Sequence, residues 1–355
     1  MTMRPHIPLS PRLTLLPLLA AVLLLTGCSP ALPADYQRTI YAFGTLIQFS
    51  LYGVDAPRAL QLGDQVEAEL HGMHERWHAW KSSEVTRLNA ALARGESFQV
   101  SPDVADLIRL SKETYRSSGG RFNAAAGHLF ALWGFQSDIP PEGPPPTPEQ
   151  IAAVLAEHAS MDDVELDGDW VRSRNPHVAL DFGGIAKGYA GQVILKELRA
   201  QGVKNAILNA GGGLQAMGRH GGRRWRIGIR APKGSGILGA LEVGPSEEGL
   251  HTSGNYERYR EYAGKRYQHI IDPRSGLPAQ HIISATVIHP NGALADAAAT
   301  ALVIAGPERW DEVARAMGIK LALLVDDQDT LYMTPAMQGR VVLERPPTKV
   351  VIREW

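Results

Sequence analysis

The stretch VALDFGGIAKGY, residues 178–189, combines an apolar segment, a glycine-rich turn and the start of a helical pattern. A strand is predicted to end at Asp181, and Gly183 and Gly184 form the turn. Such a turn presents free backbone N–H groups and the positive end of a helix dipole to an anion. Lys187 adds a mobile positive charge that suits phosphate. Asp181 would repel phosphate, so it fits a metal ion or a polar part of a ligand better. A tight turn that happens to carry a lysine is the alternative.

The first thirty residues have the layout of a bacterial export signal. Arg4 and Arg12 precede an apolar run over residues 13–25, which is too short for a comfortable membrane span. Leu-Thr-Gly-Cys then ends at Cys28 and resembles a lipoprotein lipobox. We therefore expect a signal peptide over 1–27, with Cys28 as the lipidated first residue of the mature chain.

Residues 28–38 are predicted to be a tether between the lipid and the folded protein. Ser29 in place of Asp resembles lipoproteins sorted to the outer membrane, so we expect the protein on the periplasmic face of the envelope. An ordinary signal peptide with a stray cysteine is the alternative. Cys28 is the only cysteine of the 355 residues, which excludes an intramolecular disulfide and a cysteine-cluster metal site. The net charge of −1 gives no electrostatic reason to bind nucleic acid.

The hydrophobic patterning predicts an α+β fold in residues 39–355. It has mixed, largely antiparallel sheets with packed helices, in two intimately associated subdomains. A proline-rich loop is expected over 137–148. Helices are predicted at residues 57–77, 103–117, 148–157, 186–198, 295–304 and 308–317. Strands are predicted at residues 39–52, 164–166, 170–172, 206–209, 225–230, 239–243, 267–271, 283–289, 321–325, 331–333 and 341–343.

Two motifs point away from a phosphate site. His74-Glu75-Arg76-Trp77-His78 matches the zinc-protease pattern H-E-x-x-H on a predicted helix, but the glycine of the extended pattern is missing because Lys81 stands there. A coincidental match at a helix end is the preferred interpretation. The run from Gly211 to Ala216 fits G-x-G-x-x-A, but no helix is predicted after it, so a dinucleotide fold is rejected.

Two further pairs suit chemistry at a phosphate. Asp296 and Thr300 stand four residues apart on one predicted helix face, where hard oxygen ligands suit Mg²⁺. An aspartate on an alanine-rich helix is the plain alternative. His269 and Asp272 lie near a predicted strand end and could do acid–base work.

In their order along the chain, these segments resemble the bacterial FAD:protein FMN transferases. The resemblance runs from about Thr39 to Leu324. It is carried by residues 43–45, 80–81, 83–89, 120–123, 132–135, 181–189, 209–212, 252–256, 269–273 and 296–300.

The resemblance implies Mg²⁺-dependent transfer of FMN from FAD to a Thr or Ser hydroxyl of a target protein. The product is a phosphoester and AMP leaves. The implied partner is a periplasmic or membrane redox protein. The general base is His269 or Asp181. The metal is implied at Asp296, Thr300 and the Gly184 carbonyl. FAD contacts are implied at Phe43, Trp80, Arg121, Phe122, Asn123, Asp181, Lys187, Ile270 and Ile271.

Three alternatives stay open at this point. Some members of the resembled family hydrolyse FAD to FMN and AMP instead of transferring FMN. A non-catalytic lipoprotein that stores flavin would bind FAD without releasing AMP. A zinc metalloprotease would use His74, Glu75 and His78, and its zinc content would distinguish it.

Overall fold

A computed structural model describes residues 1–2, 35–139 and 141–354. Cys28 and the predicted signal peptide lie outside the described residues, so their assignment stays a prediction. Within the described part, no helix is both long enough and apolar enough to cross a membrane.

The centre of the molecule is a nine-stranded sheet in the order β1-β2-β6-β7-β10-β13-β14-β15-β17. Neighbouring strands are antiparallel except β15 and β17, which are parallel. The strands are β1 (Asp35–Ala42), β2 (Thr45–Tyr52), β6 (Ala206–Ala210), β7 (Gly213–Met217), β10 (Glu248–Gly254), β13 (Ile282–His289), β14 (Leu321–Asp326), β15 (Thr330–Met333) and β17 (Lys349–Ile352).

Three small sheets accompany the central one. Their strands are β3 (Phe98–Gln99), β4 (Val164–Asp167) and β5 (Trp170–Ser173); β8 (Trp225–Arg230), β9 (Ile237–Val243) and β16 (Val342–Leu343); and β11 (Tyr259–Tyr262) with β12 (Lys265–Gln268).

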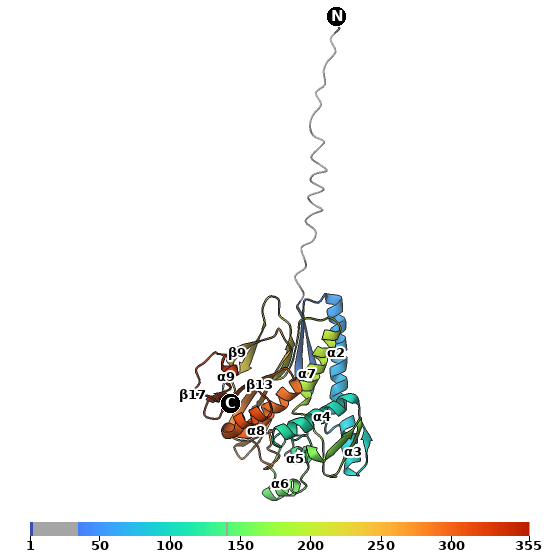
Figure 1. The fold of residues 1–355 in the computed structure, drawn as a ribbon, viewed down its shortest axis with the longest axis vertical. Helices are drawn as coiled ribbons and strands as arrows, with labels where there is room; N and C mark the ends of the chain where they lie inside the picture. Colours follow the sequence, from blue (N-terminus) through green and yellow to red (C-terminus); the bar gives the residue numbers. More distant parts are fainter. Residues whose placement is uncertain (3–34, 140, 355) are drawn as a thin grey trace.

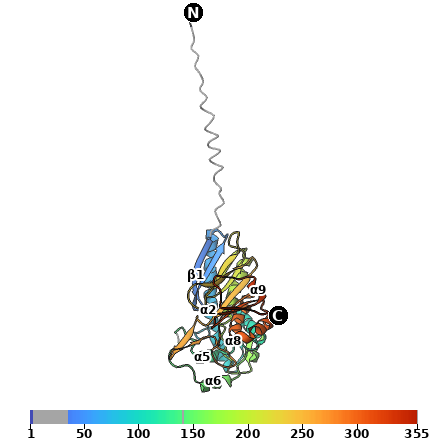
Figure 2. The same ribbon diagram turned by 90° about the vertical axis from the view of Figure 1, so that its left-hand side faces the viewer.

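Helices gather mainly on one face of the central sheet and at one end of the molecule (Figures 1 and 2). They are α2 (Ala56–Trp77), α3 (Glu84–Ala93), α4 (Pro102–Ser117), α5 (Gly127–Leu132), α6 (Pro148–Leu155), the 3-10 helix η1 (Met161–Asp163), α7 (Ala186–Ala200), α8 (Gly292–Ala316) and α9 (Pro335–Gln338). Both views place α5 and α6 together at the end of the molecule away from the N-terminus. The predicted α+β class with mostly antiparallel sheets is confirmed, while the division into subdomains stays a prediction.

The central sheet separates two hydrophobic clusters because strand side chains alternate between its faces. On β14, Ala322 and Leu324 join the cluster beneath the helices, whereas Leu323 and Val325 join the cluster that lies under β8 and β9. A third cluster around Trp133 fills the space beneath α5 and α6. The sheet is thus covered by helices on one side and by the small sheet on the other.

The strand predicted to end at Asp181 is wrong, and the strand predicted at 267–271 is confirmed only at its start. Residues 178–180 are extended and lie beside residues 124–127, with an isolated bridge between Ala179 and Ala126 and a few backbone hydrogen bonds, but they form no regular strand. The side chain of Asn89 takes the place of a neighbouring strand for Leu180, because it accepts from the Leu180 N–H at 2.7 Å and donates to its carbonyl at 2.9 Å. Strand β12 ends at Gln268, so 269–271 lie beyond it, and the chain turns at Asp272 and Pro273.

Helix α8 joins the two helices predicted at 295–304 and 308–317. Asn291 caps its start and accepts the Leu294 N–H at 2.9 Å, and Gly306 breaks the helical backbone with φ 74° just before Pro307. Asp296 and Thr300 both lie in the first, regular part, as predicted.

Helices α7 and α8 approach so closely that only glycine fits between them. A Cβ on Gly188 would lie 2.1 Å from the carbonyl oxygen of Gly292 and 2.9 Å from the Cβ of Asp296. The Gly188 N–H donates to Oδ2 of Asp296 at 3.1 Å. This crossing brings the start of α7 against the first turns of α8.

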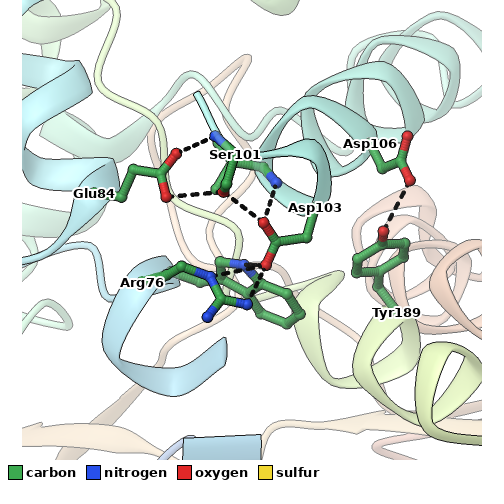
Figure 3. A network of polar contacts seen from close by, with 8 residues as sticks. Arg76, Glu84, Ser101, Asp103, Asp106 and Tyr189 are labelled. Carbon is green, nitrogen blue, oxygen red and sulfur yellow. Dashed lines mark hydrogen bonds and ion pairs between the residues drawn. The ribbon is translucent and has the colours of Figure 1, made fainter. Parts of the chain in front are cut away.

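Helix α4 links α2 and α7, because polar side chains near its start bind both of these helices (Figure 3). Asp103 accepts from the Arg76 guanidinium at 2.6 Å and from the Trp77 indole N–H at 2.9 Å. The Tyr189 hydroxyl donates to Asp106 at 3.0 Å. Because Tyr189 is two residues after Lys187, this network helps to fix the start of α7.

We expect Gly188→Ala to destabilise the protein, because the added methyl group must displace backbone atoms of α8. Overpacking of this kind costs about 1–3 kcal/mol. The control is exposed Gly222→Ala, where a Cβ would meet nothing within 4 Å. That change should alter the stability by less than about 0.5 kcal/mol. Equal unfolding midpoints in urea for Gly188→Ala and the unmodified protein would contradict the close approach of α7 and α8 at Gly188.

Candidate functional site

A single cavity of about 390 Å³ is lined by every residue that the family resemblance assigned to FAD, metal or catalysis. They come from six separate segments of the chain. These residues are Phe43, Trp80, Arg121, Phe122, Asn123, Asp181, Gly184, Lys187, His269, Ile270, Ile271, Asp296 and Thr300. Segments far apart in sequence therefore converge on one site. Asp272, the other acid–base candidate, does not line this cavity and instead binds the Arg274 guanidinium at 2.7 and 2.9 Å.

The glycine-rich turn forms one wall of this cavity. Oδ1 of Asp181 accepts the Gly183 N–H at 2.9 Å, which closes the turn, and Oδ2 accepts from Gln136 at 2.8 Å. The half-buried Lys187 makes a long hydrogen bond of 3.4 Å to the Gly183 carbonyl. Both carboxylate oxygens of Asp181 already hold donors, so its contacts suit positioning of the turn, and Lys187 is the mobile cation beside it.

A buried carboxylate lies opposite the turn. Burial raises the pKa of Asp296, but Lys187, His251 and the Gly188 N–H outweigh it and hold that pKa below its ordinary value. Nδ1 of His251 lies 3.6 Å from Oδ1 of Asp296, which is an ion-pair distance but too long for a hydrogen bond. Asp296 is thus ionised at neutral pH.

Hydroxyl oxygens extend the carboxylate into a cluster of hard donors. Oγ1 of Thr300 and Oγ of Ser253 are 3.0 Å apart. A Cβ on Gly184 would lie 3.8 Å from that Thr300 oxygen, so the glycine turn borders the cluster directly. Oxygen donors of this kind favour Mg²⁺ over transition metals.

Arg121 supplies a second cation, which is almost fully buried. One terminal nitrogen donates to the Ser118 carbonyl at 3.1 Å, while its Nε has no hydrogen-bond partner among the described residues. A buried guanidinium nitrogen without a partner is costly unless a ligand accepts from it. The Asn123 side chain, unlike that of Arg121, already has partners for both polar atoms, because it donates to the Ala159 carbonyl and accepts the Ala125 N–H.

Aromatic rings form the remaining walls. Phe43 stacks on the buried Trp77 with centroids 5.7 Å apart, and Phe122 lies against Gly184. Trp80 stands at the rim with 37% of its surface exposed. These faces suit a flat ring system.

His269 faces the cavity in a defined tautomer. Its Nδ1 lies 3.0 Å from the Arg258 carbonyl, and because a carbonyl only accepts, Nδ1 carries the proton. The ring is partly exposed to the cavity, yet burial by the surrounding protein lowers its pKa to about 4. At neutral pH the ring is therefore uncharged, with the Nε2 lone pair available as a base.

The sequence analysis assigned no role to His251 or Ser253. Both lie on β10 two residues apart, so they share the face that packs against α8. Strand alternation would have grouped them, but β10 was not predicted. Gln136 was also missed, because nothing in the sequence indicates its contact with Asp181.

The structure agrees with the preferred interpretation of His74, Glu75 and His78, a coincidental match at a helix end, and not with the zinc-protease alternative. Helix α2 ends at Trp77, so His78 lies beyond the helix. Within residues 35–139 and 141–354, no group of three or more His, Cys, Asp or Glu side chains could hold a metal ion.

A larger cavity of about 670 Å³ lies beside the first and is lined by His128, Glu157 and His177 among others. Asn123 is the one predicted site residue on its wall. The chemistry-bearing residues gather in the smaller cavity, which is therefore the candidate site.

Comparison with known proteins identifies the family and the fold. Residues 43–323 match the model of the ApbE family. The chain is 43% identical over 326 residues to an FAD:protein FMN transferase of Rhodobacter capsulatus, covering 91% of this chain but only 62% of that protein. It is 30% identical to a transferase of the same name from Klebsiella pneumoniae, covering 92% and 97%.

The solved apo structure of the Pseudomonas stutzeri flavinyl transferase ApbE superposes with a TM-score of 0.76 at 30% identity, covering 86% of this chain and 96% of that one. These matches confirm the enzyme class predicted from the resemblance. The chain therefore belongs to the ApbE family, whose members named here are FAD:protein FMN transferases.

Proposed function

We propose that the protein transfers FMN from FAD to a Thr or Ser hydroxyl of an acceptor protein in a Mg²⁺-dependent reaction that releases AMP. The observation that carries the proposal is the convergence of two cations, Lys187 and Arg121, with the ionised Asp296 and aromatic walls on one cavity. FAD has the matching parts, which are an anionic pyrophosphate and two flat ring systems.

The donor set fits Mg²⁺. Asp296 and Thr300, with the Gly184 carbonyl, would hold the ion, because all three offer hard oxygen atoms. Bound Mg²⁺ would offset the negative charge that builds up on the pyrophosphate during phosphoryl transfer. The pKa of the buried Asp296, which Lys187, His251 and the Gly188 N–H hold below its ordinary value, supports this fit because a metal ligand must be ionised.

The chain's own residues would bind and orient the nucleotide. Lys187 and the N–H groups of the glycine turn suit the phosphates, since both donate to anions at a helix start. The unpartnered Nε of Arg121 supplies a further donor. Phe43 and Trp80 suit the flat rings of the ligand.

In the proposed step, the acceptor hydroxyl oxygen attacks the phosphorus of the FMN half. A new P–O ester bond forms, the bridging P–O bond breaks, and AMP leaves with the bridging oxygen. Nε2 of His269 takes the hydroxyl proton. The anionic pyrophosphate would raise the low pKa of His269, which makes the ring a better base when FAD is bound. A periplasmic or membrane redox protein is the proposed acceptor.

The decisive experiment incubates pure protein with FAD, MgCl₂ and a flavin-free redox subunit. Covalent flavin fluorescence in a denaturing gel should appear together with an equal amount of AMP. AMP without labelled acceptor would support FAD hydrolysis instead, and FAD binding without AMP would support flavin storage.

Asp296→Ala should weaken Mg²⁺ binding and cut turnover by at least about a hundredfold, a scale suited to lost transition-state charge stabilisation. Turnover is measured against MgCl₂ concentration, with the exposed Glu308→Ala in the same helix as control. Unchanged activity of Asp296→Ala at limiting Mg²⁺ would remove Asp296 from the site.

Lys187→Ala should weaken FAD binding by roughly tenfold or more, the scale of a charge-assisted hydrogen bond. The fold should stay intact because half-buried Lys187 makes one long hydrogen bond, to Gly183, and interacts with Asp296 through charge without a direct contact. Salt should change the effect little, since a closed site is poorly screened. Fluorescence quenching gives the affinity, and exposed Lys196→Ala on α7 is the control. A collapsed melting temperature would indicate a structural lysine.

We further propose that the mature protein is lipidated at Cys28 and faces the periplasm. Cys28→Ser should leave the precursor uncleaved, because the lipoprotein peptidase needs the modified cysteine. Membrane fractionation and gel mobility of the precursor measure this. Normal processing and membrane attachment of the variant would contradict the lipoprotein assignment.

A further inference from the structure

Phe43 holds an unusual backbone conformation at the tip of the β1–β2 hairpin. Its φ is 52°, in the left-handed region that a bulky side chain rarely adopts. Its N–H donates to Nδ1 of His74 at 3.2 Å, and its ring meets the His74 ring edge-on at 5.6 Å. His74 therefore holds a strained residue that faces the cavity.

His78 accepts the backbone N–H of Trp80, as His74 accepts that of Phe43. Nδ1 of His78 accepts the Trp80 N–H at 3.3 Å and the Lys81 N–H at 3.1 Å. The His78 and Trp80 rings lie 4.4 Å apart. These bonds turn the chain out of α2 and set the direction in which Trp80 leaves the helix end.

Both histidines are thus committed to one role and one tautomer. A backbone N–H can only donate, so each Nδ1 must be unprotonated, with the ring proton on Nε2. The two rings lie 5.3 Å apart, so they form one unit between the hairpin and the end of α2.

We propose that His74 and His78 are positioning residues for flavin-nucleotide binding, which set Phe43 and Trp80 through their backbone N–H groups. This inference rests on the proposed function, because it assumes that the cavity takes FAD. It assigns a task to the two histidines of the H-E-x-x-H sequence that involves no metal.

The surroundings keep both rings neutral. Burial, then Lys81 and His71, lowers the pKa of His74, against weaker opposition from Asp138 and Glu75. Burial, then His74 and Lys81, lowers the pKa of His78 against Asp138 and Asp181. Above pH 6.5, the ordinary histidine pKa, Nδ1 of both rings therefore stays unprotonated and can accept a hydrogen bond. Protonation removes this acceptor as the pH falls below 6.5 through the lowered pKa of the folded protein.

Paired variants test the proposal. Asparagine places Oδ1 close to the position of histidine Nδ1 and keeps an acceptor, whereas leucine removes it. His74→Leu and His78→Leu should each raise the Kd for FAD about five- to tenfold, the scale of a lost hydrogen bond with its partner left unpaired. His74→Asn and His78→Asn should stay within about threefold of the unmodified protein.

The readouts separate positioning from folding and from catalysis. FAD affinity is measured by fluorescence quenching without Mg²⁺, and the melting temperature is measured on the same samples. In the transfer assay the KM for FAD should rise while kcat is retained. The matched control is His71→Leu, since exposed His71 on the same helix bonds the Tyr41 carbonyl of the hairpin at 3.2 Å and does not line the cavity. It should bind FAD normally.

Acidification gives an independent test that needs no leucine variant. The FAD affinity of the unmodified protein should fall as the pH drops from 6.5 to 5, and the double variant His74→Asn/His78→Asn should show a much smaller fall. The same pH profile in both proteins would overturn the inference, as would normal FAD affinity in both leucine variants. Failure of the unmodified protein to bind FAD would instead overturn the proposed function. If a leucine variant unfolds, the asparagine variants and the pH profile decide.

Discussion

The close crossing of α7 and α8 is the constraint on which the site depends. Gly188 and Gly292 let the two backbones approach, and the Gly188 N–H binds the carboxylate of Asp296. This one contact places the glycine turn and Lys187 beside the ionised carboxylate. A side chain at either glycine would push the helices apart, and Lys187 would then move away from Asp296. Packing and chemistry are therefore set by the same few atoms.

The cavity also carries charges that a purely structural core would avoid. Asp296 is buried beside a histidine whose two ring nitrogens make no hydrogen bond, and Arg121 keeps a buried nitrogen without a partner. Buried groups of this kind are unfavourable unless a ligand satisfies them. The surrounding core of α7, α8 and the central sheet is rigid enough to hold them in place. The protein thus keeps binding capacity for an anionic nucleotide at the expense of local stability.

The two histidines of the H-E-x-x-H sequence show why a local motif does not define a site. Zinc binding needs both rings on one helix face, but α2 ends between them, at Trp77. Nδ1 of each ring instead accepts backbone N–H groups, from the hairpin tip for His74 and from the α2–α3 connection for His78. The spacing is a property of the sequence, whereas the helix end and the hairpin that meets it belong to the tertiary structure.

The sequence by itself determined the helices with clear periodicity, the glycine turn before α7 and the ligand types at Asp296 and Thr300. These features depend on neighbours within a few residues, as does the order of motifs that indicated the family. Only the tertiary structure decided that Leu180 pairs with the side chain of Asn89, and that His251 and Ser253 lie beside Asp296 and Thr300. Such contacts join residues tens of positions apart, and no local pattern encodes them because burial and pairing across the sheet form only when the whole chain packs.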